Sequence, residues 1–223
     1  MILSSPAVRS VDLQALADAP LMTDPFPFVL VPNFIRAAAY AGICADFPKI
    51  DKGGSFPLSS LEFGPAFAAL CDELTSPEIR EHFQNKLRID LADRPATLTV
   101  RGQTVKKNGA IHIDSRSKLV TVLIYLNDGW ESDGGRLRLL HSSSNLEDSF
   151  AEIPPTHGAM VAFVNTTNAW HGHKPFVGPR RSIQLNWVTN EAAASKADRR
   201  HAWSARVKSV LSFWGRPSGE IMS

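Results

Sequence analysis

The stretch "AIHIDSRSK", residues 110–118, holds a histidine and an aspartate two positions apart between apolar neighbours. If Ile111 and Ile113 mark a β-strand, the two-residue period puts His112 and Asp114 on the same face. A neutral imidazole beside a carboxylate is half of a metal site or half of an acid–base pair. An isolated pair of this kind is more often a hydrogen bond at a strand edge, so the pair needs support from other residues.

That support comes from a second histidine-bearing segment. Four of the seven histidines fall in expected helices or loops: His82, His141, His157 and His201. The segment "NAWHGHKPFVGPRRSIQLNW" brings His171 and His173, and either one would complete a two-histidine, one-carboxylate triad with His112 and Asp114. Such a triad leaves three octahedral positions open, as in non-haem Fe(II) oxygenases, whereas a tetrahedral zinc hydrolase would leave one.

Two arginines follow these histidines, and a guanidinium is a fixed, always-charged fork for the carboxylate of an organic acid. Strand alternation divides "RRSIQLNW" into two faces: Arg180, Ser182, Gln184 and Asn186 on one, and Arg181, Ile183, Leu185 and Trp187 on the other. The first face is polar and suits a ligand-lined barrel interior. Alternation therefore favours Arg180 as the carboxylate anchor, with Ser182 beside it, and Arg181 is the alternative.

The elements that must position these residues are predominantly short strands. Residues 96–190 hold six β-rich runs separated by turn residues: "TLTVRG", "AIHID", "LVTVLIYL", "RLRLL", "AMVAFV" and "RSIQLNWV". Strands at this spacing without intervening helices predict an antiparallel sandwich or barrel. Residues 1–95 form a mostly helical segment that includes a strand at "FVLV", and residues 191–223 return to a helix and tail. Ser10 and Ser76 are the expected N-caps of two helices, with Pro77 at the first helical position of the second.

The composition is that of one globular domain. The chain has 223 residues, of which 43% are hydrophobic and 21% charged, and its net charge of +2 gives no indication of nucleic acid or membrane as a partner. Cys44 and Cys71 read as buried thiols in a reducing compartment. The start "MILSSPAVRSVDLQ" becomes polar too soon for a signal peptide. We therefore expect a cytoplasmic protein, and the oligomeric state stays open.

Five motifs occur in an order and spacing typical of one family: "HID", "VTVLIYLND", "DGGRLRLL", "PPTHGAMVAFV" and "WHGHKPFVGPRRSIQLNW". Across residues 97–189 the sequence resembles the Fe(II)/2-oxoglutarate-dependent dioxygenase superfamily, and within it the prolyl-hydroxylase-like branch. The resemblance implies a mainly β fold with flanking helices, built on a double-stranded β-helix (jelly roll) core. Residues 96–190 would be this core, buttressed by the N-terminal segment.

The resemblance also implies cofactors and roles. The iron ligands would be His112, Asp114 and His171, with His173 as the competitor for the last position. The residues binding 2-oxoglutarate would be Arg180, Ser182 and Tyr125. The implied co-substrates are 2-oxoglutarate and O2, with ascorbate as a candidate reductant. Succinate and CO2 would be released as a C–H bond of a protein side chain or a small molecule is hydroxylated.

The residue at the carboxylate position of the expected metal site indicates the reaction class. Relatives that halogenate have a small residue at the carboxylate position, so an intact Asp114 favours hydroxylation. The other classes considered are a cupin-like binding or sensor protein and a metal-dependent isomerase or hydrolase. Neither needs a carboxylate anchor such as Arg180 beside the metal.

The candidates for contact with the substrate lie near the expected pocket mouth: Lys106, Lys107, Trp130 and His173.

Overall fold

The computed structural model describes residues 9–195, which form two facing β-sheets with helices on one side. The strands of the large sheet are β1 (Phe28–Val31), β2 (Phe56–Pro57), β3 (Ala96–Thr104), β4 (Lys118–Tyr125), β7 (Met160–Val164) and β9 (Gly178–Val188). Those of the small sheet are β5 (Leu137–Leu140), β6 (Ser149–Ile153) and β8 (His171–Gly172). The strand orders are β1-β7-β4-β9-β3-β2 and β6-β5-β8, with antiparallel pairing throughout.

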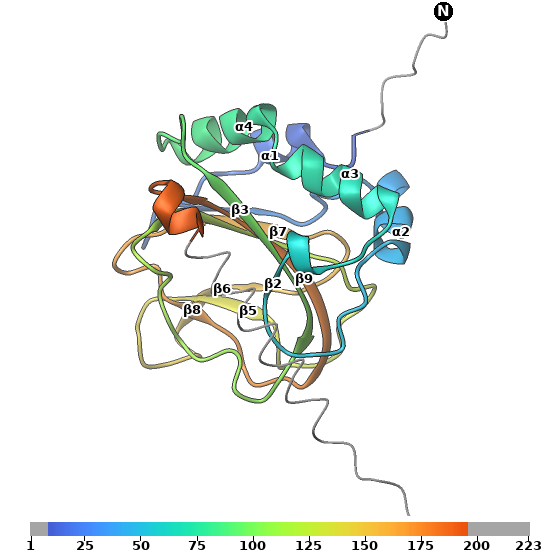
Figure 1. Ribbon diagram of the computed structural model, residues 1–223. Coiled ribbons are helices and arrows are strands. Elements are labelled where there is room, and N and C mark those ends of the chain that lie inside the picture. Colours follow the sequence, from blue (N-terminus) through green and yellow to red (C-terminus); the bar gives the residue numbers. More distant parts are fainter. Residues whose placement is uncertain (1–8, 196–223) are drawn as a thin grey trace, which may run out of the picture.

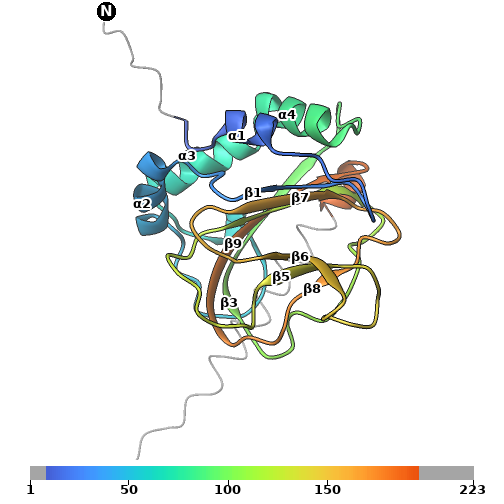
Figure 2. The ribbon, with the colours of Figure 1, turned by 180° about the vertical axis from the view of Figure 1, so that it is seen from behind.

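The helices cover the outer face of the large sheet, and the small sheet lies on the opposite side (Figures 1 and 2). Their bounds are α1 (Leu13–Asp18), α2 (Ala37–Ala45), α3 (Pro65–Leu74) and α4 (Pro77–Leu87), with a short 3-10 turn at Leu58–Ser60. This arrangement confirms the predicted mainly β fold with flanking helices and a jelly-roll core. Among residues 9–195, no helix is both long and apolar enough to cross a membrane.

The helix starts agree with the sequence in one case and differ in the other. Ser76 caps α4 as expected, because its hydroxyl accepts the backbone N–H of Ile79. The expected cap Ser10 was wrong, since α1 begins after Asp12, whose carboxylate accepts the N–H of Ala15 at 3.0 Å. Aspartate caps as well as serine does. The backbone N–H of Ser10 instead donates to a carboxylate oxygen of Glu73, at 2.8 Å.

Two hydrophobic cores lie on the two faces of the large sheet. The larger packs the helices against the sheet and includes Trp187 of β9, whose ring lies 5.4 Å from that of Phe83 in α4. The smaller lies between the sheets and includes Tyr125 and Phe163, both fully buried. Strand β9 pairs with β3 on one side and β4 on the other, so its outward residues are held by the helices and its inward residues face the small sheet.

Three segments differ from the sequence-based expectations or extend beyond the described residues. The expected strand at residues 110–114 is not a strand: only His112 forms a bridge, to His171. The segment between His141 and His157, which is not among the six expected β-rich runs, contains strand β6. Residues 191–195 are helical, and the remainder of the expected C-terminal helix lies outside the described residues.

Candidate metal centre and its cavity

A cavity of about 530 Å³ lies between the two sheets. Its wall on the large sheet consists of the inward residues of β3, β4 and β9, because alternate residues of a strand face the same side. The small sheet contributes Leu137 of β5 and residues 171–172 of β8. The chain between β3 and β4 closes another side with residues that include His112 and Asp114.

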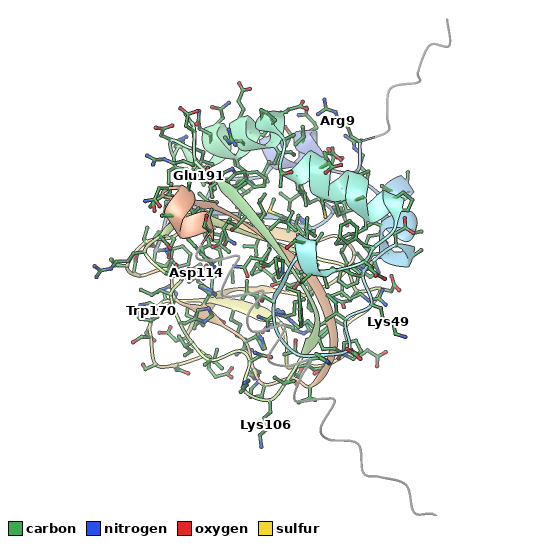
Figure 3. The ribbon with its side chains drawn as sticks, viewed as in Figure 1. Arg9, Lys49, Lys106, Asp114, Trp170 and Glu191 are labelled. Carbon is green, nitrogen blue, oxygen red and sulfur yellow. The ribbon has the colours of Figure 1, made fainter. Side chains whose placement is uncertain are left out.

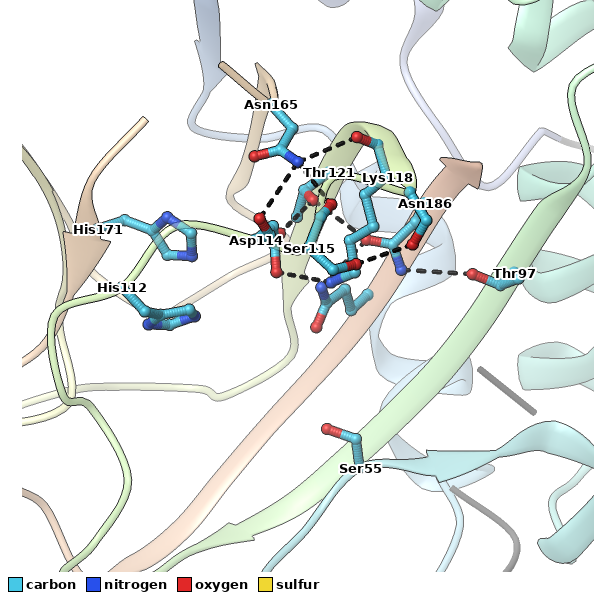
Figure 4. A network of polar contacts seen from close by, with 12 residues as sticks. Ser55, Thr97, His112, Asp114, Ser115, Lys118, Thr121, Asn165, His171 and Asn186 are labelled. Carbon is cyan, nitrogen blue, oxygen red and sulfur yellow. Dashed lines mark hydrogen bonds and ion pairs between the residues drawn. The ribbon is translucent and has the colours of Figure 1, made fainter. Parts of the chain in front are cut away.

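One end of this cavity holds a cluster of potential metal ligands, namely His112, Asp114 and His171. One potential ligand atom of each residue lies within 4.8 Å of those of the other two. Among residues 9–195, no other group of three His, Cys, Asp or Glu residues has ligand atoms this close together. The backbones of His112 and His171 exchange two N–H···O hydrogen bonds of 3.0 Å, which hold their rings 4.3 Å apart. This bridge joins the β3–β4 connection to the small sheet, and Figure 4 shows the two rings and Asp114 converging.

The backbone fixes which ring nitrogen each histidine presents to the cavity. The Nδ1 atoms of His112 and His171 lie 2.9 Å from the carbonyl oxygens of Ala110 and Ala169. A carbonyl oxygen can only accept, so both Nδ1 atoms carry the proton and both Nε2 atoms keep a free lone pair. Burial, reinforced by His112, lowers the pKa of His171 to about 4, which keeps this ring neutral near pH 7. Neutral imidazoles oriented in this way are suited to bind a metal.

The carboxylate of Asp114 is held at both oxygens. Lys118 Nζ donates to Oδ1 at 2.7 Å, and Thr121 Oγ1 donates to Oδ2 at 2.5 Å. Burial acts to raise the pKa of Asp114, but Lys118 and the other neighbours outweigh it and the pKa is lowered. Asp114 is therefore an oriented carboxylate anion, and each oxygen keeps a lone pair for a metal.

A chain of polar side chains continues from Asp114 across the large sheet (Figure 4). Thr121 Oγ1 also lies 3.1 Å from Asn186 Oδ1, and Asn186 Nδ2 lies 3.5 Å from Thr97 Oγ1. These three residues are buried and come from three adjacent strands, β4, β9 and β3. The rigid sheet therefore sets the position of the carboxylate, although Asp114 itself lies outside any strand.

The donor set fits an iron ion. Two imidazole nitrogens and one carboxylate oxygen form the facial arrangement that non-haem Fe(II) oxygenases use. Their free atoms converge on one point at the cavity wall, so a bound ion would keep open positions toward the cavity. The same donors could hold zinc, but the adjacent cationic wall described next is suited to an organic acid beside the metal.

Arg180 lines the cavity and is 6% exposed. Its Nε donates to the carbonyl of Gly135 at 2.7 Å, and its Nη2 lies 3.4 Å from the hydroxyl of Tyr125. The guanidinium also lies over the Tyr125 ring, 5.0 Å from its centre. Tyr125 itself is fully buried behind Arg180 and is not part of the cavity wall, whereas Ser182 is.

Arg181 points to the opposite face of β9. It is exposed, and its guanidinium lies 5.3 Å from the centre of the Phe47 ring. The alternation inferred from the sequence thus describes the actual faces of β9, with Arg180 in the cavity and Arg181 outside it.

His173 lies in the cavity wall but outside the ligand cluster. It is 7% exposed, and its Nδ1 lies 2.8 Å from the carbonyl of Lys174. A Cβ on Gly109 would come within 2.5 Å of that Nδ1, so the chain between β3 and β4 packs directly on this ring. Burial, followed by the charge of Arg180, lowers the pKa of His173 to about 4.

Of the three remaining candidates for contact with the substrate, only one lines the cavity. Lys107 lines the cavity, whereas Lys106 is exposed and points away from the body of the protein (Figure 3). Trp130 is not in the cavity wall either: its ring packs on Phe176, and its Nε1 donates to the carbonyl of Gly134.

Several site residues were missed from the sequence. Lys118, Thr97 and Arg101 carried no motif, and all three line the cavity. A usable signal existed for two of them, because Thr97, Thr99 and Arg101 alternate with apolar Leu98 and Val100 in "TLTVRG". Lys118 gave no comparable signal, because its contact with Asp114 depends on the turn at residues 115–117.

Comparison with known proteins supports the same class of enzyme and fold. The model of the 2OG-Fe(II) oxygenase superfamily matches residues 102–189, and no curated protein matches the chain. A Pseudomonas putida prolyl-4-hydroxylase structure is similar with a TM-score of 0.53 and 20% identity, over 80% of this chain and 91% of that one. A Phytophthora capsici prolyl 4-hydroxylase has a TM-score of 0.53 and 17% identity, over 87% and 71%.

A third structure, the viral collagen prolyl hydroxylase of Paramecium Bursaria Chlorella virus-1 in its 2OG complex, has a TM-score of 0.51 and 14% identity, over 73% and 96% of the chains. These likenesses confirm the prolyl-hydroxylase-like fold. Residues 102–189, which include the segments that carry His112, Asp114, His171 and Arg180, match the family model of the 2OG-Fe(II) oxygenase superfamily. The name of that superfamily implies Fe(II) and 2-oxoglutarate, and the clustered His112, Asp114 and His171 in the matched segment form a possible iron site.

Proposed function

We propose that the enzyme hydroxylates a C–H bond of an organic substrate at the His112–Asp114–His171 centre. In the balanced reaction, 2-oxoglutarate, O2 and the substrate give succinate, CO2 and the hydroxylated product. The observation that carries the proposal is the convergence of two Nε2 lone pairs and one anchored carboxylate at the wall of a cavity that also contains Arg180. The bound iron would supply the activation of O2.

The side chains of this protein have separate tasks in that reaction. Arg180 would bind the distal carboxylate of 2-oxoglutarate, assisted by the hydroxyl of Ser182. Tyr125 holds the Arg180 guanidinium through its ring and hydroxyl, and so acts on the co-substrate through Arg180. Lys118 and Thr121 keep the carboxylate of Asp114 deprotonated and oriented.

Two observations support hydroxylation as the outcome. Asp114 supplies a carboxylate at the position where a halogenating relative would have a small residue. The similar structures are named prolyl 4-hydroxylases or a collagen prolyl hydroxylase, which are hydroxylating enzymes. A cupin-like binding protein or a metal hydrolase would have no need for the buried guanidinium of Arg180 next to the metal ligands.

The test is succinate formation from 2-oxoglutarate with added Fe(II) and ascorbate. We expect slow formation by the wild type even without its substrate, and loss of it in Asp114→Ala because a metal ligand is removed. The matched control is Asp72→Ala, which removes an exposed carboxylate from α3 on the far side of the large sheet. Succinate formation by Asp114→Ala at the rate of the control would contradict the proposal.

A further inference from the structure

The cavity wall carries more positive charge than one molecule of 2-oxoglutarate can compensate. Among the described residues that line it, the cations are Arg101, Lys107, Lys118 and Arg180, and the acid is Asp114. Lys118 is paired with Asp114 at 2.7 Å, which leaves the other three without an acid in this wall. The two arginines are the important ones, because a guanidinium stays charged when it is buried.

Neither arginine has an acidic partner among residues 9–195. The hydrogen bonds of Arg180 go to the carbonyl of Gly135 and the hydroxyl of Tyr125. The Nη2 of Arg101 donates to the hydroxyl of Ser55 at 3.0 Å. All three acceptors are neutral. Burial, followed by the charge of Arg180, lowers the pKa of Arg101, as expected for a cation that lacks a counter-ion.

The strand register places the two guanidinium groups on the same face of the large sheet. Arg101 of β3 lies opposite Ser182 of β9, so Arg180 is its diagonal neighbour on the same side. Like charges this close in a cavity destabilise each other unless anions separate them. The distal carboxylate of 2-oxoglutarate can neutralise one guanidinium, and its other end is taken up by the metal.

We propose that Arg101 and Ser55 form a second anion subsite in the cavity, and that this subsite binds the carboxylate of the substrate that is oxidised. The substrate would then be a small carboxylic acid. The volume of about 530 Å³ is within the range of small-molecule pockets and can hold two small molecules side by side. In Figure 4 the Ser55 side chain lies apart from His112 and His171, and all three residues line the same cavity. This inference rests on the proposed function for the location of the metal and of 2-oxoglutarate.

Acetate is a direct probe of this subsite, and acetamide is its neutral isostere. The full chain is loaded with Mn(II) and saturating 2-oxoglutarate, and the relaxation of the probe's methyl protons by the paramagnetic ion is followed by NMR during a titration. We expect saturable binding of acetate and none of acetamide. In Arg101→Gln the apparent affinity for acetate should fall at least tenfold. In the matched control Arg181→Gln, which alters the exposed arginine on the other face of β9, it should stay unchanged.

Arg101→Lys keeps the charge and should retain acetate binding, so it tests the subsite even if the glutamine variant folds poorly. The proposal is overturned if acetate does not bind the loaded wild type, or if it binds Arg101→Gln as well as it binds the wild type. It is also overturned if Arg101→Gln loses affinity for 2-oxoglutarate as strongly as an Arg180 variant, because Arg101 would then belong to the co-substrate site. Failure of the proposed function would be visible separately, as absence of succinate formation with Fe(II).

Discussion

The two histidines of the ligand cluster share a local geometry that the third cavity histidine lacks. His112 and His171 each donate Nδ1–H to the carbonyl oxygen two residues earlier, whereas the Nδ1 of His173 faces the carbonyl of the next residue. The spacing of His171 and His173 in the sequence permits either to complete the triad, since side chains two apart on a strand share a face. The backbone bridge between His112 and His171 decides which ring lies beside Asp114.

The roles of His171 and His173 can be separated by measuring metal binding. We predict that His171→Ala loses Mn(II) binding in calorimetry, with Mn(II) serving as a redox-silent substitute for iron. His173→Ala should retain binding, with a loss of at most roughly 100-fold, because it removes a neighbour and not a ligand. Loss of Mn(II) binding in His173→Ala alone would mean that the distal ligand is His173 and not His171. Arg180 would then lie too close in sequence to the distal ligand to be the expected carboxylate anchor.

Alternate side chains of strand β9 face the cavity and the hydrophobic core beneath the helices. Its inward face carries Arg180, Ser182 and Asn186, and its outward face packs Trp187 against the ring of Phe83 in α4. A slip of one residue would exchange the two faces. Burial of Trp187, which is 1% exposed, therefore fixes the register that delivers Arg180 to the cavity.

The register gives a prediction for the arginine pair. Arg180→Ala should weaken apparent 2-oxoglutarate affinity at least tenfold, because losing one partner of a buried charged contact costs about 2–5 kcal/mol. Arg181→Ala should change it little, since its guanidinium lies over Phe47 on the outer face. Titrating 2-oxoglutarate in the succinate assay for both variants measures the difference. The reverse ranking would mean that Arg181 is the anchor and that β9 faces the other way.

The elements differ in how well the sequence predicts them. The longer strands β3, β4 and β9 were predicted because each has eight or more residues, which is long enough to hold a β-rich run that is visible in the sequence. Strands β2 and β8 have two residues each, which is too short for any period to be visible. The expected strand at residues 110–114 failed for a related reason: its alternation is present, but His171 is the only described residue that bridges to it.

At the scale of the molecule, the candidate site exists because the two sheets close on each other. His112 and Asp114 come from the connection between β3 and β4, His171 comes from the small sheet, and Arg180 comes from the large one. The motifs predicted these four residues, since each motif has a fixed order and spacing. They did not predict the contact of Asp114 with Lys118, which depends on the turn at residues 115–117. Nor did they predict the contact of Arg101 with Ser55, which joins β3 to a segment far away in the sequence.

The most direct measurement of the central claim is the fate of O2 at this centre. With 18O2, Fe(II) and 2-oxoglutarate, the wild type should produce succinate that carries one 18O atom, detected by mass spectrometry, because a dioxygenase transfers one oxygen atom to succinate and the other to the substrate. The His112→Ala variant should produce no labelled succinate, since it lacks one of the three ligands. Two results would contradict the account: succinate without 18O from the wild type, or succinate with one 18O atom formed by His112→Ala at the wild-type rate.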